Sequence, residues 1–178
     1  MLDAAERLFA EHGYEGASMA GIGAAAGLSR GAPGYFFGSK EALYRAVVQR
    51  LFEARESALG PAFEPLRSGS AAFDDALRSA IRGYLDFLRE RPAFVWVIER
   101  EALSGGRRLS RTPHESRTVE QAFAALPGAV DVRAATIAFV SLCFFPVAHR
   151  DTFLPAVGAT LGDVEPLVLE VMRGLLVR

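Results

Sequence analysis

Hydrophobic residues recur every three or four positions along most of the chain, and no segment sustains the strict alternation of a half-buried strand. The pattern therefore predicts an all-α protein. In the first segment, one helical face carries Leu2, Ala5, Leu8 and Phe9. This helix is predicted to end at Gly13, because glycine suits the positive φ of a helix C-terminal cap.

Three serines precede the next three helical segments, and serine accepts hydrogen bonds well at a helix N-terminus. Ser18 is predicted to cap a short helix, Ser29 a second short helix, and Ser39 a longer one. The pair Gly60-Pro61 is predicted to interrupt the chain after the longer helix.

The second half of the chain continues the helical pattern. After the polar stretch 67–70, an amphipathic helix is predicted to end near Pro92. The apolar run 94–98 alone fits a strand as well, but Pro92 before it and the charged residues after it favour a helix. Residues 104–113 are predicted to form a loop. The remaining helices are predicted at about 114–126, 131–149 and 163–177.

The last two predicted helices carry more apolar surface than the others. Segment 131–149 is apolar nearly all round, and 163–177 has a wide apolar stripe at spacings of a helix face. A single chain can cover one apolar face with its own helices. The apolar face that remains needs a partner chain, which predicts a homodimer. The alternative is a helix that lies centrally in one bundle. The predicted interface residues are Val164, Leu167, Val168, Val171, Met172 and Leu175.

Composition narrows the possible functions. The chain has 178 residues, 20 of them Lys or Arg and 21 Asp or Glu, and this balance excludes a polycation that binds nucleic acid by charge alone. A local basic face remains compatible with the total. The lone cysteine, Cys143, excludes an internal disulfide and is interpreted as a buried small residue. Neither a signal peptide nor a bilayer-spanning segment is predicted, so we expect a cytoplasmic protein.

No residue pattern predicts catalysis or a cofactor. The histidines are His12, His114 and His149. None has a second metal ligand at helical spacing, and neither a serine nucleophile elbow nor an acid–base carboxylate pair is visible. Gly21, Gly23 and Gly27 match part of a dinucleotide-binding pattern, but Gly21 and Gly23 lie inside a predicted helix, which favours close helix packing instead. We expect a non-enzymatic protein without cofactor or metal; a helical-bundle enzyme is the alternative that bound-cofactor absorbance would reveal.

Residues 18–37 form a pattern that points to DNA. Two short helices joined by a Gly-containing turn have the size of a helix-turn-helix, although other helical hairpins share this size. Capped helix N-termini accept phosphate oxygens, and small residues let a backbone approach base edges. Lys40, the single lysine, fits an ordinary solvated helix start equally well. The candidate DNA-binding residues are Ser18, Ser29, Arg30, Gly31, Ala32, Tyr35 and Lys40.

Five stretches in the N-terminal part carry a more specific signal: Leu2–Ala5, Leu8–Tyr14, Ser18–Ile22, Ala25–Gly31 and Tyr35–Leu43. Across residues 2–48 the chain resembles the tetracycline-repressor (TetR) family of bacterial transcriptional regulators. Beyond them it is similar only in helical layout and length. The resemblance implies a helix-turn-helix DNA-binding domain at 1–48 and an effector-binding and dimerisation bundle at 49–178.

The resemblance also implies roles for single residues. Ser18, Ser29, Tyr35 and Lys40 would contact phosphates, and Arg30, Gly31 and Ala32 would face the major groove. The implied function is a homodimeric repressor that binds a double-stranded DNA operator and is released by a small hydrophobic ligand. The alternative is a helical dimeric interaction protein that has lost sequence-specific DNA binding. A gel shift with DNA from upstream of the protein's own gene separates the two.

Two features depart from the family pattern. The family usually has a large residue followed by Tyr where this chain has Pro33-Gly34, so we expect a recognition helix that starts late or is distorted. The family's basic segment before the first helix is missing here, and we expect a native start upstream of Met1. Residues 1–50 hold five basic and five acidic side chains. This balance predicts weak, salt-sensitive DNA binding.

The second half offers aromatic residues for an effector pocket. The candidates are Tyr84, Phe87, Phe94, Trp96, Phe123, Phe139, Phe144 and His149. A pocket lined by such rings suits a hydrophobic effector. The alternative for the rings is that they fill the core, and for His149 that it is a solvated helix end.

Overall fold

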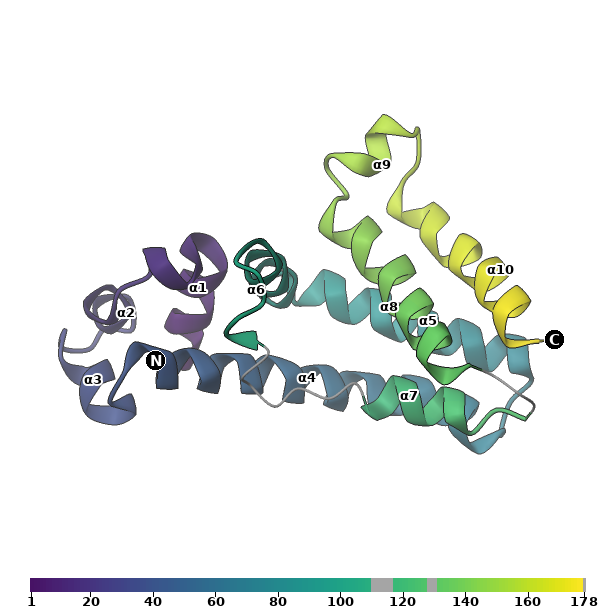
Figure 1. The fold of residues 1–178 in the computed structure, drawn as a ribbon, viewed down its shortest axis with the longest axis horizontal. Coiled ribbons are helices and arrows are strands. Elements are labelled where there is room, and N and C mark those ends of the chain that lie inside the picture. Colours follow the sequence, from purple (N-terminus) through teal and green to yellow (C-terminus); the bar gives the residue numbers. More distant parts are fainter. Residues whose placement is uncertain (110–116, 128–130, 178) are drawn as a thin grey trace. The chain divides into compact units, whose positions relative to one another are not determined.

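Helices form all the regular structure in residues 1–109, 117–127 and 131–177, the ranges that the computed structural model describes (Figure 1). The helices are α1 (Leu2–Gly16), α2 (Met19–Ala25), α3 (Ala32–Phe37), α4 (Lys40–Ser68), α5 (Phe73–Glu90), α6 (Pro92–Leu103), α7 (Arg117–Ala124), α8 (Val132–Ala148), α9 (Phe153–Ala156), the 3-10 turn η2 (Leu161–Asp163) and α10 (Val164–Leu176). The prediction of an all-α fold is confirmed. The loop predicted at 104–113 and the start of the helix predicted at 114–126 lie partly outside the described residues.

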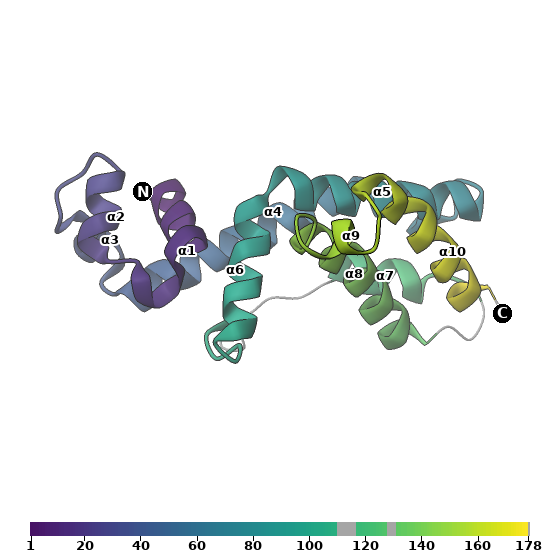
Figure 2. The same ribbon diagram turned by 90° about the horizontal axis from the view of Figure 1, so that it is seen from above.

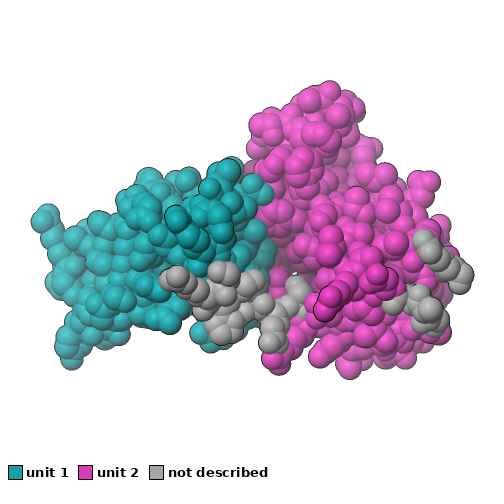
Figure 3. Space-filling view, viewed as in Figure 1, with its two compact units in different colours: residues 1–54, 92–115 teal, residues 55–91, 116–178 magenta. Residues whose placement is uncertain are grey.

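The helices gather into two compact units, which Figure 3 colours separately. The first unit comprises Met1–Ala54 and Pro92–Glu115, and the second comprises Arg55–Arg91 and Ser116–Arg178. Helix α4 contributes to both, and α6 joins the N-terminal helices rather than its sequence neighbours α5 and α7. The functional division at residue 48 stays a prediction, because compactness is not a test of function.

Aromatic contacts hold the first unit together. Phe9 of α1 is 1% exposed and packs edge-to-face on Tyr44 of α4, with ring centroids 4.9 Å apart. Helix α6 contacts α1. It also buries Phe94, whose ring centroid lies 5.4 Å from that of Phe52. The helical interpretation of 94–98 is therefore confirmed. Gly13 interrupts the helical geometry of α1 with φ 72°, as its predicted role requires.

The predicted break at Gly60-Pro61 is wrong. Helix α4 continues through Pro61 and Pro65 to Ser68. Proline removes one intrahelical hydrogen bond and costs a helix about 3 kcal/mol. The apolar face of α4 nevertheless continues past this point, since Leu59, Phe63 and Leu66 are all buried. Tertiary packing outweighs the local preference, and the chain turns only at Gly69, which has φ 66°.

Four aromatic rings from four helices form the centre of the second unit. Phe139 of α8 lies 5.3 Å from Phe63 of α4, 5.5 Å from Tyr84 of α5 and 5.6 Å from Phe123 of α7, measured between ring centroids. Helix α8 contacts α5, α7 and α10 (Figures 1 and 2). The unit therefore closes around α8, in line with the nearly all-round apolar character of that segment.

Ion pairs join α10 to α5 on the surface of the second unit. Glu165 accepts hydrogen bonds from Arg82 at 2.9 Å and Arg78 at 3.1 Å, and Arg173 pairs with Asp74. The guanidinium groups, Arg82 foremost, hold the pKa of Glu165 below its usual range. The short helix α9 and the turn η2, which lead into α10, were not predicted because they carry too few residues for a helical period.

Gly83 of α5 lies close against Ala62 of α4 in the second unit. A Cβ atom at this position would lie 2.3 Å from the Cβ atom of Ala62. Gly83→Ala is therefore expected to lower the free energy of unfolding by about 1–3 kcal/mol, although alanine normally stabilises a helix interior. Chemical denaturation measures the change. The double variant Ala62→Gly/Gly83→Ala moves the methyl group to the other helix and should recover part of the loss; additive losses would contradict this close contact.

Candidate nucleic-acid interface

Helices α2 and α3 form a helix-turn-helix within the first unit. Ser18 caps α2 by accepting a hydrogen bond from the Gly21 amide at 3.0 Å, as predicted. Gly27 has φ 69° and begins the turn. Helix α2 contacts α1 on one side and α3 on the other. The unit thus holds two short helices in a fixed arrangement.

Gly23 explains why this stretch needs glycine. A Cβ atom there would lie 2.6 Å from the Ser29 carbonyl oxygen and 3.2 Å from Cδ of Pro33. The amide of Leu28 donates to the Gly23 carbonyl at 2.9 Å, which closes the turn on the same residue. Gly23 therefore serves close packing between the two helices, the interpretation that the sequence favoured over a dinucleotide site, whereas a Cβ atom at Gly27 would meet nothing within 4 Å.

The prediction that Ser29 caps the third helix is wrong. Helix α3 begins at Ala32, its N-cap is Gly31, and no side chain caps it. Pro33 stands in the first helical turn, where an amide donor is not needed and where the fixed φ of proline fits. The recognition helix therefore starts late, as the proline predicted. Ser29 and Arg30 lie in the turn that precedes it.

Most of the predicted DNA-contact residues are exposed on this unit. Ser18, Ser29, Arg30, Gly31 and Tyr35 are exposed, whereas Ala32 and Lys40 are half-buried. Tyr35 is 86% exposed. Exposure is a requirement for contact with DNA and not a test of it, so the roles of these residues stay predictions.

Phe36 was missed by the sequence analysis. It is 65% exposed beside Tyr35, and the two rings meet edge-to-face with centroids 5.3 Å apart. The helix that carries this pair has six residues. Because both rings are exposed, packing in the core of the first unit does not account for their presence. Its place in the motif next to Tyr35 was the available signal, but burial was the expected state for a phenylalanine.

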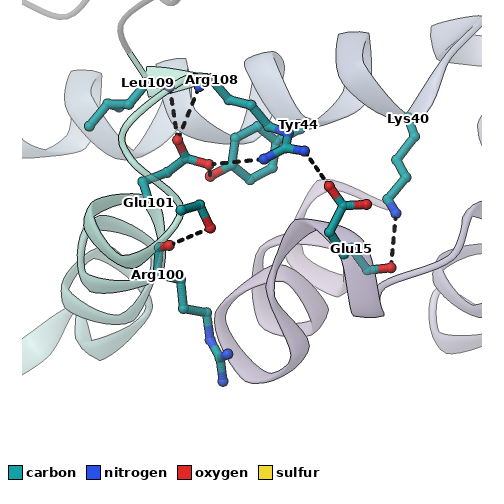
Figure 4. Close-up of polar contacts among 8 residues, drawn as sticks. Glu15, Lys40, Tyr44, Arg100, Glu101, Arg108 and Leu109 are labelled. Atoms are coloured by element: carbon teal, nitrogen blue, oxygen red, sulfur yellow. Dashed lines mark hydrogen bonds and ion pairs between the residues drawn. The ribbon is translucent and has the colours of Figure 1, made fainter.

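Lys40, at the start of α4, is held by two contacts. Ser39 caps this helix, as predicted, by accepting from the Ala42 amide at 3.1 Å. The Lys40 ammonium donates to the Glu15 carbonyl at 3.3 Å (Figure 4). It also lies 4.5 Å from the centre of the Tyr14 ring. These two contacts fix the position of the ammonium at the start of α4, and the role of Lys40 as a phosphate contact stays a prediction.

A buried polar cluster lies behind Lys40 in the same unit. Glu101 of α6 is 2% exposed and accepts hydrogen bonds from the Tyr44 hydroxyl at 3.1 Å and from the amides of Arg108 and Leu109 at 3.2 and 3.1 Å (Figure 4). Burial, together with the Glu101 charge, raises the pKa of Tyr44 above its usual range. The hydroxyl therefore stays protonated and donates to the carboxylate. Sequence reasoning did not single out any of these residues.

A cavity of about 200 Å³ adjoins this cluster in the first unit. Its wall includes Phe9, His12, Tyr14, Arg100 and Glu101. Arg100 donates to the carbonyl of Ala10 at 2.8 Å, which ties α6 to the end of the regular part of α1. None of the residues predicted for an effector pocket lines this cavity.

The predicted effector residues divide between the two units. Tyr84, Phe123 and Phe139 are buried in the second unit's core, Phe87 is buried there too, and Phe144 and His149 are half-buried. Phe94 and Trp96 belong to α6 in the first unit, and Trp96 is 52% exposed. The structure thus does not bring the eight residues together in one unit. The prediction omitted Phe63, which completes the aromatic core.

The predicted dimer residues divide by exposure. Val164, Val168 and Met172 are buried by the chain's own helices. Leu167 and Val171 are 53% and 42% exposed, and Leu175 is half-buried. On the neighbouring α8, Ile137 and Phe145 are 67% and 43% exposed. An apolar stripe therefore remains uncovered on both helices.

Metal-ligating and membrane-spanning features are missing from the part of the chain that the structure describes. No group of three or more metal-ligating side chains occurs within the described ranges. None of the helices in those ranges combines the length and apolarity that crossing a bilayer requires. Cys143 is buried, and its burial raises the pKa of the thiol.

Comparison with known proteins agrees with this geometry. Residues 1–47 match the model for bacterial regulatory proteins of the tetR family. The HTH-type transcriptional repressor AcnR of Corynebacterium glutamicum is 38% identical over 104 residues, which cover 58% of this chain and 47% of AcnR. The repressor NicS of Pseudomonas putida is 23% identical over 92% of this chain and 81% of its own. AcnR of Corynebacterium efficiens matches over 39% of its length, so the chain spans less than half of both AcnR relatives.

Solved structures match over nearly the whole chain. A TetR-like transcriptional regulator from Rhodococcus sp. RHA1 has a TM-score of 0.68 and 25% identity, and the match covers 99% of this chain and 94% of that one. PfmR from Thermus thermophilus, a TetR family regulator, has a TM-score of 0.66 and 24% identity over 98% and 96% of the two chains. The all-helical fold and the helix-turn-helix of the first unit are those of a DNA-binding protein. Residues 1–47 match the tetR family of bacterial regulatory proteins, and the whole chain has the fold of TetR-like regulators.

Proposed function

We propose that the protein is a DNA-binding transcriptional repressor that acts as a homodimer. The observation that carries this proposal is the helix-turn-helix of residues 18–37, which presents exposed polar, basic and aromatic side chains beside the short helix α3. The named repressors AcnR and NicS support it. A protein that binds an operator works beside the chromosome in the cytoplasm, in a regulatory rather than a catalytic role.

We infer two kinds of DNA contact. Lys40 and the exposed hydroxyls of Ser18, Ser29 and Tyr35 bind phosphates, since these groups donate hydrogen bonds without reading sequence. Arg30, with Gly31 and Ala32, faces base edges in the major groove. Phe36 joins them, because its exposed ring suits apolar contact with a thymine methyl group.

A specificity experiment tests this division. Lys40→Ala should weaken binding to every duplex and reduce the salt slope by about one unit. Arg30→Ala should cost about 1–3 kcal/mol on DNA from upstream of the protein's own gene and much less on random DNA. Fluorescence anisotropy titrations at several salt concentrations measure both variants. If Arg30→Ala lowers the affinity for both duplexes equally, Arg30 contacts a phosphate and not a base edge.

The dimer interface is proposed on α8 and α10. Leu167 and Val171 of α10 and Ile137 and Phe145 of α8 leave apolar surface uncovered, and α8 and α10 contact each other. A twofold interface buries the same patch on both chains, so one apolar patch on each chain is sufficient to form a dimer. Two half-sites one helical turn apart require recognition helices about 34–36 Å apart, which a dimer supplies.

The effector is proposed to be a small hydrophobic molecule with one hydrogen-bonding group. It would enter the aromatic core around Phe139, whose neighbouring rings must then separate. On the same face of α8, the Thr136 hydroxyl is buried and has no hydrogen-bond partner among the described residues. A ligand atom that pairs with it would remove the cost of leaving that group unsatisfied.

Release from DNA requires the effector to bind the two states of the repressor with different affinity. Titrating upstream DNA with and without a bound apolar compound tests this mechanism. Unchanged operator affinity at saturating compound would leave a constitutive DNA-binding protein.

A further inference from the structure

Two cations share one aromatic ring in the first unit. The guanidinium carbon of Arg108 lies 3.9 Å from the centre of the Tyr14 ring, and the Lys40 ammonium lies 4.5 Å from the same point. A cation over an aromatic face gains about 0.5–1 kcal/mol at an exposed site. Two cations so close repel each other unless an anion lies between or beside them.

Glu15 supplies that anion and links the two cations. Its carboxylate pairs with Arg108, and its backbone carbonyl accepts the hydrogen bond from Lys40 at 3.3 Å (Figure 4). The Glu15 side chain is 81% exposed. Within the described part of the chain, its pairing with Arg108 is therefore the contact that fixes the direction in which this carboxylate points.

Arg108 is itself fixed from α6. The buried carboxylate of Glu101 accepts from the backbone amides of Arg108 and Leu109 and lies 3.9 Å from the Arg108 guanidinium. The Tyr44 hydroxyl donates to the other oxygen of Glu101 at 3.1 Å. The residues that follow α6 are thereby held against the end of α1, although more than ninety positions of the sequence separate Arg108 from Glu15.

We propose that Arg108 is a positioning residue for DNA binding, which keeps the Glu15 carboxylate away from Lys40 so that the Lys40 ammonium stays available to phosphate. Without Arg108, the exposed carboxylate is left unpaired beside the only lysine of the chain. It then turns to Lys40 and neutralises the charge that phosphate would otherwise meet. This inference rests on the proposed role of Lys40 and adds the residue that controls it.

A salt-dependence experiment tests the proposal. The probe is a labelled random duplex about three helical turns long, because a phosphate contact is independent of sequence. Arg108→Gln should weaken binding about two- to fivefold at low salt and reduce the salt slope by up to about one unit. Arg150→Gln removes the same charge from an exposed side chain in the second unit and serves as the control. Equal effects of Arg108→Gln and Arg150→Gln would overturn the proposal.

Rescue separates positioning from charge. The double variant Glu15→Gln/Arg108→Gln removes the carboxylate that captures Lys40, so its affinity and salt slope should return toward those of the wild type. In the Lys40→Ala background, Arg108→Gln should have no further effect. Failure of the rescue, or independent losses in the double variant with Lys40→Ala, would overturn the proposal.

The position of Lys40 can also be measured without DNA. Because the chain has one lysine, ¹³C-lysine labelling gives the NMR signals of Lys40 alone. The Tyr14 ring should shift the ε-methylene protons upfield, and Arg108→Gln should move them when the ammonium turns to Glu15. Unchanged signals would overturn the positioning role while leaving the proposed function intact. A wild-type chain that binds neither upstream nor random DNA would instead overturn the proposed function.

Discussion

Gly23→Ala is expected to abolish sequence-specific DNA binding. The added Cβ atom would lie 2.6 Å from the Ser29 carbonyl oxygen, and a backbone atom cannot move away as a side chain can. The turn and α3 must shift, so α3 no longer fits the major groove in register with the phosphate contacts. The loss should approach the whole gap between specific and non-specific affinity, about 10³-fold or more. Anisotropy titration with upstream DNA measures it, and thermal unfolding reports any loss of stability.

Gly34→Ala is the matched control for this variant. Its Cβ atom would have no neighbour within 4 Å, and it lies within α3 itself. The change should leave DNA affinity within a fewfold and stabilise the helix by up to about 1 kcal/mol. Near wild-type operator affinity for Gly23→Ala would show that the turn does not set the position of the recognition helix.

Val171→Glu is expected to convert the protein into a monomer. Val171 is 42% exposed on α10, so a glutamate there is tolerated by the isolated chain. In a twofold interface the same change buries two uncompensated charges, at about 3–5 kcal/mol each. The dissociation constant of the dimer should rise by at least about 10⁴-fold. Light scattering should then give a mass of 19.2 kDa instead of twice that value.

The control replaces another exposed valine outside the two interface helices. Val157 is 58% exposed after α9, and Val157→Glu should leave the dimer intact. Operator affinity should fall for Val171→Glu and not for Val157→Glu, since a monomer reaches only one half-site. A dimer that survives Val171→Glu at micromolar concentration would place the interface elsewhere.

Local sequence signals predicted most of the helices, because the helices of the structure begin and continue where these signals place them. The serines at 18 and 39 cap α2 and α4, and the charged residues after 94–98 identified a helix correctly. The failures occur where tertiary contacts outweigh local preference. Pro61 stays inside α4 because Leu59 and Phe63 continue its buried face.

The candidate site was predictable only where one short segment contains it. Residues 18–40 carry the helix-turn-helix in consecutive positions, so a motif is enough to find it. The contacts around Lys40 and Glu101 join Glu15, Tyr44, Glu101 and Arg108, which come from distant parts of the chain. No periodicity in the sequence relates such residues. A glutamate in a charged stretch is expected to be exposed, whereas Glu101 is only 2% exposed.

The central claim is that this chain binds operator DNA specifically as a dimer. The most direct measurement is a titration of the wild-type protein against duplex DNA from upstream of its own gene, with random duplex of equal length and composition as competitor at physiological salt. The account predicts two chains per duplex and an affinity for the upstream DNA at least about 10³-fold above that for random DNA. Equal affinity for the two duplexes would contradict it and favour a helical interaction protein that has lost its operator.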